Sequence, residues 1–105
     1  VRNGIVYLAF SGGSAGGYSY AEGFLIANEN DDLLNVLNWY KKTMPIQTSY
    51  TVEGEFGPGH NSFFEDVDGT SYIVYHAKEA INNAPRCTGV KKLGFHKDGE
   101  PYVVK

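Results

Sequence analysis

Residues 68–76, DGTSYIVYH, decide how this sequence is interpreted, because residues 3–11, NGIVYLAFS, repeat their pattern. Gly4 corresponds to Gly69, an offset of 65 residues. In both stretches a short turn motif, Asn-Gly or Asp-Gly, precedes a run rich in β-branched and aromatic residues, which is typical of a β-hairpin. The sequence therefore predicts two copies of one strand-forming unit.

The strand that follows each copy is repeated as well. EGFLIA, residues 22–27, matches TGVKKL, residues 88–93, with Gly23 against Gly89. Two units that share a turn, a strand and the next strand indicate duplication of a small antiparallel sheet. Four-stranded sheets that recur along a chain are typical of β-propellers, although a sandwich or a meander of hairpins would give the same periodicity.

Six β-strands are expected, separated by residues that favour turns. They are residues 4–10, 19–27, 60–66, 71–77, 87–95 and 101–105. A helical pattern occurs in NDDLLNVLNWY, residues 30–40, where Asn30, Asp31 and Asp32 are the candidate caps and one or two turns are expected within a loop. The predicted fold class is therefore all-β.

Composition narrows the classes of function. The chain has 105 residues and a net charge of -3, and its nine Lys and Arg residues are scattered, so we expect no nucleic-acid partner. We also expect no membrane association, because no apolar run approaches the length of a membrane span. The single cysteine, Cys87, excludes an internal disulfide. Because the first residue is Val1 rather than Met, we expect a processed product or a fragment.

FGPGHNSF, residues 56–63, brings a histidine to the start of a predicted strand by a constrained route. Gly57 and Gly59 offer no side-chain bulk, and Pro58 fixes the backbone φ angle. We therefore expect the backbone to approach neighbouring strands closely here.

Three motifs together resemble a known family: GPGHNSF, IVYHA and the DGEP turn at residues 98–101. The chain resembles the C-terminal part of family 43 glycoside hydrolases, above all the α-L-arabinofuranosidase and arabinanase-like members, over essentially its whole length. The resemblance implies a five-bladed β-propeller, of which this chain supplies about two blades of four-stranded antiparallel sheet. Residues 1–50 would be a partial fourth blade that lacks its first strand, and residues 51–105 would be the fifth blade.

The resemblance also implies an activity: cleavage, with inversion, of arabinose- or xylose-containing plant polysaccharides such as arabinan or arabinoxylan by a secreted or periplasmic enzyme. Inversion needs two carboxyl groups about 6.5–9.5 Å apart, with room for a water between them and the sugar. The three catalytic carboxylates of the family fall outside residues 1–105, so we expect no catalytic residue here and no activity from this chain alone.

The partners of the chain would be the carbohydrate and the remaining blades or copies of itself. The alternative is a non-catalytic fragment that self-associates or binds carbohydrate.

Four residues are candidates for contact with the substrate: Tyr20, Phe56, His60 and Arg86. The aromatic face of Tyr20 suits either a sugar ring or packing between blades. The resemblance implies that His60 points into a central channel and contributes to a bound metal, usually calcium; a histidine hydrogen-bonded there without metal is the alternative. Arg86 leads into the predicted strand of residues 87–95. The family pattern has a second arginine near the position of Gly89, and this sequence lacks it.

Three carboxylates and one further histidine are interpreted as non-catalytic. Glu22 is expected to be exposed or ion-paired. Glu53 and Glu55 are expected on one face of an extended segment, roughly 7 Å apart, which invites an inverting mechanism. Both come from one glycine-rich loop, whereas catalytic carboxylates normally lie on different rigid elements, so we assign them no such role. His76 is expected to be buried and hydrogen-bonded, on the opposite strand face from Tyr75.

Overall fold

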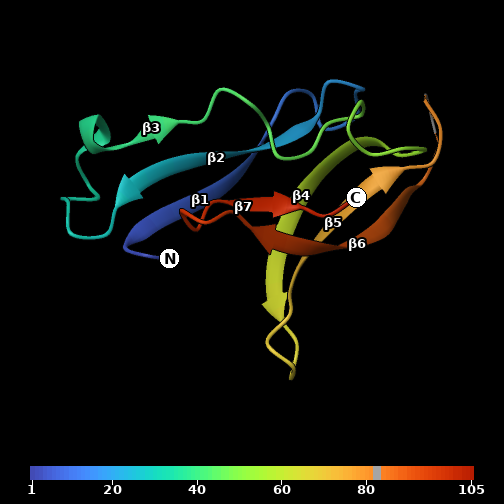
Figure 1. Cartoon of the computed structure of the whole chain (residues 1–105). Coiled ribbons are helices and arrows are strands. Elements are labelled where there is room, and N and C mark those ends of the chain that lie inside the picture. Colours follow the sequence, from blue (N-terminus) through green and yellow to red (C-terminus); the bar gives the residue numbers. More distant parts are fainter. Residues whose placement is uncertain (82–83) are drawn as a thin grey trace.

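The computed structural model describes residues 1–81 and 84–105 and shows two separate antiparallel sheets (Figure 1). The first sheet has the strand order β1-β2-β3 and the second has the order β4-β5-β6-β7. The strands are β1 Ile5–Gly12, β2 Ala21–Asn28, β3 Tyr40–Lys41, β4 Phe56–Glu65, β5 Ser71–Lys78, β6 Arg86–Phe95 and β7 Pro101–Val103. The six expected strands are present with shifted ends. The short β3 was not expected, and β4 begins four residues earlier than predicted.

The Asx-Gly turns have the backbone geometry that their sequences predict. Asn3 and Gly4 have φ angles of 50° and 78°, the left-handed values that a tight hairpin turn requires. In the second copy Gly69 has a φ angle of 81°, and the Asp68 carboxylate accepts a hydrogen bond from the backbone N–H of Thr70 at 2.8 Å. An Asx-Gly turn with its glycine at a positive φ angle therefore precedes the equivalent strand in each sheet.

The repeat is visible in the cross-strand pairs. Phe10 of β1 lies opposite Gly23 of β2, and Tyr75 of β5 lies opposite Gly89 of β6. In each pair the aromatic ring covers the glycine: an added Cβ would lie 3.1 Å from the nearest Phe10 ring atom in the first sheet and 2.4 Å from the nearest Tyr75 ring atom in the second. A strand glycine often marks such a close approach. The pair β1–β2 is thus equivalent to β5–β6, and β4 has no counterpart among the strands that the structure describes in the first sheet.

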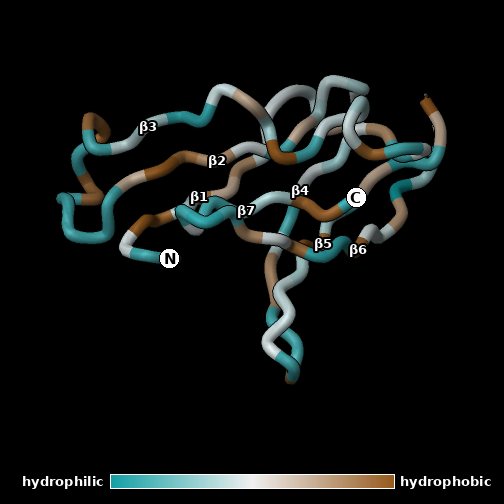
Figure 2. Tube along the Cα trace, viewed as in Figure 1, coloured by the Kyte–Doolittle hydropathy of each residue, from teal (hydrophilic) through white to brown (hydrophobic). Residues whose placement is uncertain are grey.

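The buried core gathers around β5. Strand alternation puts Ile73, Tyr75 and Ala77 on its buried face. Leu93 of β6 completes the buried cluster, and Ile46, from the segment that leaves the first sheet, packs against it. The strands carry most of the apolar residues, whereas the turn that follows β2 is hydrophilic (Figure 2). The long connection between the two sheets is therefore anchored in the core of the second.

The helical pattern forms a single 3-10 turn in a loop, within the one or two turns expected. One 3-10 turn, η1, covers Val36–Asn38, and its N-cap is Asn35, whose side chain accepts a hydrogen bond from the backbone N–H of Leu37. The prediction that residues 30–32 cap it is wrong. Leu34 and Leu37 are exposed, so no buried face supports a longer helix. Among the described residues, no helix has the length and hydrophobicity needed to cross a membrane.

We expect Gly89→Ala to lower the free energy of unfolding by about 1–3 kcal/mol, because the new methyl group overlaps the Tyr75 ring and the strand must distort to admit it. The matched control is Gly16→Ala, in a loop where an added Cβ meets no atom within 4 Å. Urea unfolding of both variants measures the difference. Equal stability of the two variants would contradict the cross-strand arrangement.

Candidate functional site

The glycine-rich start of β4 lies against the loop between β1 and β2. A Cβ atom at Gly57 would lie 2.8 Å from the backbone oxygen of Gly17, and one at Gly59 would lie 1.9 Å from Cε1 of the Tyr20 ring. Gly57 has a φ angle of 60°, and the register between β4 and β5 shifts twice in this stretch. The close approach predicted from FGPG is therefore confirmed, and it depends on the missing side chains.

His60 lies where β4 meets β1. Its φ angle of 54° falls in the left-handed region, which non-glycine residues rarely adopt. Its backbone N–H donates a hydrogen bond to Ser11 Oγ at 2.8 Å, which holds this bulged backbone against the first sheet. The imidazole is exposed, and its centroid lies 6.0 Å from that of His76. The bulge therefore presents one histidine beside another at the junction of the two sheets.

His76 stacks with Tyr20, with ring centroids 5.8 Å apart. It lies on the face of β5 opposite the buried Tyr75, as expected. Its Nδ1 is buried and, within the described part of the chain, has no hydrogen-bond partner, which differs from the expected hydrogen-bonded histidine. Burial, followed by the positive charges of Arg86 and His60, lowers the pKa of His76. The neutral imidazole is therefore favoured in this stack.

Phe56 and Arg86 both contact the loop of residues 13–20. Phe56 packs beside Tyr18, with ring centroids 5.8 Å apart. Arg86 donates a hydrogen bond from Nη2 to the backbone oxygen of Ala15 at 2.9 Å. The structure thus brings the four candidate residues to the region where this loop meets the second sheet, with Arg86 supporting the loop.

Ser49 joins this loop to β4. Its hydroxyl donates to the backbone oxygen of Tyr18 at 2.6 Å and accepts from the backbone N–H of Gly57 at 2.8 Å. Ser49 is buried, so one side chain fixes the loop relative to the strand that carries His60. Sequence reasoning missed this residue, because a serine in a polar run carries no signal of burial.

The prediction that Glu22 is exposed or ion-paired is wrong. Glu22 is fully buried, and its Oε2 accepts a hydrogen bond from Nε2 of Gln47, also fully buried, at 2.8 Å. Burial raises the pKa of Glu22 from 4.5 to about 7, and the hydrogen bond from Gln47 acts in the opposite direction. Strand alternation was the available signal, since Glu22 shares a strand face with the buried Phe24.

The expected geometry of Glu53 and Glu55 is also wrong. Gly54 between them has a φ angle of 73°, and the backbone N–H of Glu55 donates to the oxygen of Val52 at 3.3 Å, so the segment turns instead of extending. Glu55 accepts a hydrogen bond from the Tyr75 hydroxyl at 2.5 Å. Burial, and after it this hydrogen bond, raises the pKa of Tyr75. Glu53 is exposed, so the two carboxylates have different surroundings.

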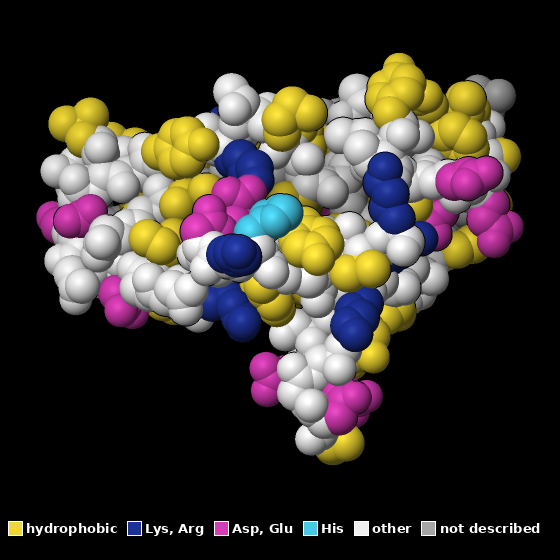
Figure 3. All heavy atoms as spheres, viewed as in Figure 1, with side chains coloured by type: hydrophobic (Ala, Val, Ile, Leu, Met, Phe, Trp, Pro, Cys, Tyr) yellow, Lys and Arg dark blue, Asp and Glu magenta, His cyan; other side chains and the backbone are white. Residues whose placement is uncertain are grey.

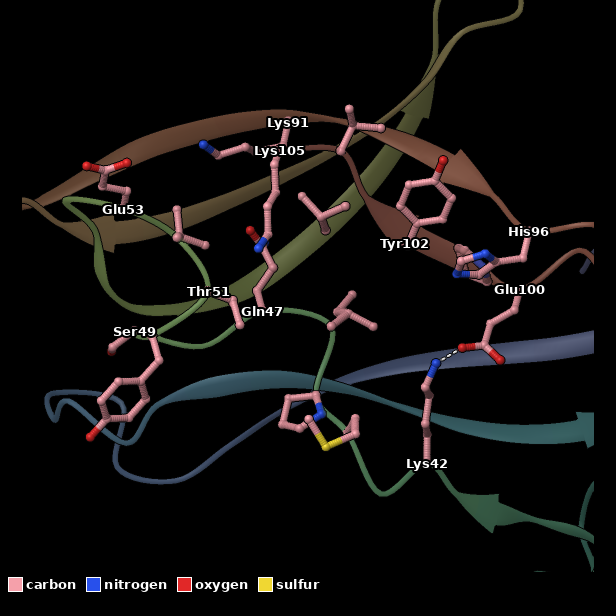
Figure 4. Close-up of a pocket in the computed structure, with 18 of the residues that line it drawn as sticks. Lys42, Gln47, Ser49, Thr51, Glu53, Lys91, His96, Glu100, Tyr102 and Lys105 are labelled. Carbon is pink, nitrogen blue, oxygen red and sulfur yellow. Dashed lines mark ion pairs between the residues drawn. The ribbon is translucent and has the colours of Figure 1, made fainter.

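A groove of about 670 Å³ opens between residues 42–54 and β7 (Figure 4). Lys42 and Glu100 form an ion pair in it, and the rings of His96 and Tyr102 lie 4.6 Å apart on the β7 side. Charged side chains of both signs gather around β7 on this face (Figure 3). None of the four candidate residues lines the groove, but Ser49, which holds the loop of residues 13–20 against β4, does.

The described residues offer few metal-binding side chains around His60. No group of three or more His, Cys, Asp or Glu side chains that could hold a metal ion gathers among them. Calcium takes about six to eight oxygen ligands, whereas His60 offers one imidazole beside the rings of His76 and Tyr20. An ion at His60 would need its oxygen ligands from water and from polypeptide beyond these residues.

Residues 1–101 match the family model described as glycosyl hydrolases family 43. The chain is 38% identical over 109 residues to α-L-arabinofuranosidase B of Pyricularia oryzae and 37% identical over 108 residues to the extracellular exo-α-(1→5)-L-arabinofuranosidase of Streptomyces avermitilis. These matches cover 96% and 95% of the chain but only 22% of each relative. The crystal structure of an α-L-arabinofuranosidase from Lactobacillus brevis matches with a TM-score of 0.84 and 38% identity, over 96% of this chain and 33% of that one. The β-propeller fold class expected from the sequence is confirmed.

We expect Ser49→Ala to lower the free energy of unfolding by about 1–3 kcal/mol, because the N–H of Gly57 is buried and would lose its acceptor. Hydrogen exchange of the Gly57 amide should accelerate by more than that of amides in β6. The control is Ser14→Ala, at an exposed position in the loop of residues 13–20 that Ser49 contacts. Unchanged exchange at Gly57 would contradict the role given to Ser49.

Proposed function

Because the chain belongs to glycosyl hydrolase family 43, we propose that it forms the C-terminal part of an enzyme that cleaves arabinose- or xylose-containing polysaccharides with inversion. The observation that carries this proposal is the match over nearly the whole chain to proteins named as arabinofuranosidases. The chain spans about a fifth of those relatives, so the activity belongs to a longer polypeptide.

The division into a partial fourth blade, residues 1–50, and a fifth blade, residues 51–105, is part of the same proposal. Its support is the equivalence of β1–β2 with β5–β6. In the second sheet β5 lies between β4 and β6, whereas β1 has β2 as its partner and its other edge is free in the described sheet. A free strand edge is a template for pairing. A strand from outside residues 1–105 is therefore expected to pair with β1 and complete the blade.

The catalytic carboxylates of the proposed enzyme lie outside this chain. Inversion needs two carboxyl groups held on rigid elements about 6.5–9.5 Å apart, with solvent access for the attacking water. Glu22 is fully buried, and Glu55 is hydrogen-bonded to Tyr75. Neither arrangement supports attack on a sugar, so the chain contributes scaffold and substrate contacts.

Tyr20, Phe56, His60 and Arg86 are the proposed contacts with carbohydrate. His60 is exposed, whereas Tyr20 and Phe56 are half-buried, and the exposed Arg86 also donates a hydrogen bond to the loop of residues 13–20. We further propose His60 as one ligand of a calcium ion whose other ligands are water and parts of the longer polypeptide.

Secretion of the protein is proposed because two relatives are named as extracellular enzymes.

We expect the purified 105-residue chain to show no turnover of aryl α-L-arabinofuranosides or aryl β-xylosides. The complete polypeptide that contains it should hydrolyse one of them and release a sugar of inverted anomeric configuration, which NMR of the first product detects. Turnover by the 105-residue chain that disappears in Glu55→Gln would defeat the assignment of catalysis to other parts. A retained configuration in the complete enzyme would defeat the inverting mechanism.

A further inference from the structure

Glu22 and Gln47 form a buried side-chain pair that the proposed reaction does not use. Their backbones form an isolated antiparallel bridge, in which the N–H of Glu22 donates to the oxygen of Gln47 at 3.0 Å. Both residues have an exposed fraction of 0%, and their side chains meet through Gln47 Nε2 and Glu22 Oε2. The pair thus ties β2 to the segment that leads into β4, out of contact with bulk solvent.

On each of these two side chains, one oxygen atom lacks a hydrogen-bond partner among the described residues. Glu22 Oε1 and Gln47 Oε1 are both buried and have no hydrogen-bond partner among the residues that the structure describes. With Glu22 ionised, both oxygens are acceptors without a donor, which is an unfavourable state for buried polar atoms. A protonated carboxyl carries an O–H and can pair with an amide through two hydrogen bonds at once. The Nε2–H of Gln47 donates to Oε2 of Glu22, and a proton on Oε1 of Glu22 would supply the donor that Oε1 of Gln47 lacks.

We propose that Glu22 is held as the neutral acid in the folded protein and that its acid–amide ring with Gln47 is a proton-dependent latch between β2 and residues 46–55. The proton comes from solvent as the protein folds. Ionisation returns it to solvent and removes the Oε1–H donor, while the bond from Nε2–H to Oε2 remains.

The groups that face Glu22 favour the neutral acid. On β1 the residue opposite it is Ser11, which is uncharged. On β5 it interacts with Tyr75, whose hydroxyl donates to Glu55. Neither residue supplies a positive charge that would favour the ionised carboxylate of Glu22.

The basic groups of the neighbouring elements are directed elsewhere. Lys42, which follows β3, forms an ion pair with Glu100. His60 of β4 contacts Ser11 through its backbone N–H, and its ring lies beside that of His76. No basic side chain is among the causes that shift the pKa of Glu22; burial dominates and raises it to about 7.

Gln47, one half of the latch, lies two residues before Ser49, whose hydrogen bonds hold the candidate site together. Gln47 is followed by Thr48 and then by Ser49, whose hydroxyl holds both the loop that carries Tyr20 and the strand that carries His60. Loss of the Oε1–H bond loosens the attachment of this segment to β2. Glu22 is therefore a positioning residue, and it acts through Gln47 and Ser49.

The direction of the pH effect follows from the two states of Glu22. Its pKa is 4.5 when unfolded and about 7 when folded, so the folded chain retains a proton that the unfolded chain releases. The contribution of the latch is complete below pH 4.5, is lost as the pH rises through about 7, and then stays constant. The difference corresponds to a roughly 300-fold fall in the folding equilibrium constant across this window.

The test combines a direct titration with a matched pair of variants. Carbon-13 NMR of the Glu22 carboxyl in the folded protein should give a midpoint near pH 7. Urea unfolding at several pH values should show the roughly 300-fold fall in the wild type and little of it in Glu22→Gln, which keeps an amide pair with Gln47 and carries no ionisable proton. Above pH 7 the variant should be more stable than the wild type. The control Glu53→Gln changes an exposed carboxylate nearby and should retain the wild-type pH dependence.

A Glu22 carboxyl that titrates near 4.5 in the folded protein would overturn the proposal, and that measurement needs only the wild type. An unchanged pH dependence in Glu22→Gln would overturn it as well. The hydrogen exchange of the Gly57 amide supplies a local readout: it should accelerate between pH 5 and pH 8 beyond the intrinsic pH effect in the wild type but not in Glu22→Gln. None of these measurements uses a carbohydrate, so their outcome is independent of the proposed activity.

Discussion

The close approach of backbone and ring at Gly59 is the contact on which the arrangement of the two sheets depends. Tyr20, from the loop of the first sheet, occupies the space that a side chain at position 59 would need. Ser49 holds the same loop and the same strand from the other side through a single hydroxyl. Because interiors are close-packed, a bulkier residue at this position would push the loop and the strand apart together.

The same contact explains why His60 is placed as it is. The bulged backbone that lets β4 pass close to the loop also leaves His60 at a positive φ angle, with its N–H held by Ser11. Strained backbone of this kind persists only where the surroundings determine it, and here they do so from both sheets. The exposed imidazole is therefore a consequence of how the sheets are joined, and it lies at the junction where the candidate residues meet.

Buried polar side chains also help to hold the two sheets together. Glu22, Gln47 and Ser49 all lie on or beside the segment that crosses from the first sheet to the second, and all three are buried. Hydrogen bonds between buried groups are directional, so they specify one position of that segment where apolar packing would allow several. The chain spans only 22% of the length of the arabinofuranosidase from Pyricularia oryzae, yet Glu22, Gln47 and Ser49 all lie within it. The outer edge of β1, in contrast, has no partner strand within the described sheet.

The sequence by itself determined six of the seven described strands, the Asx-Gly turns, the duplicated unit and the family, because these depend on short-range patterns that repeat along the chain. The pairing of Phe10 with Gly23 and of Tyr75 with Gly89 follows from that duplication. Only the tertiary structure decided the surroundings of Glu22, Glu55 and Ser49. Their partners Gln47, Tyr75 and Gly57 lie 25, 20 and 8 residues away, and burial of a polar side chain arises from contacts between segments. A pattern of neighbouring residues holds no information on which distant group will satisfy a buried oxygen, so these contacts appear only once the sheets are packed together.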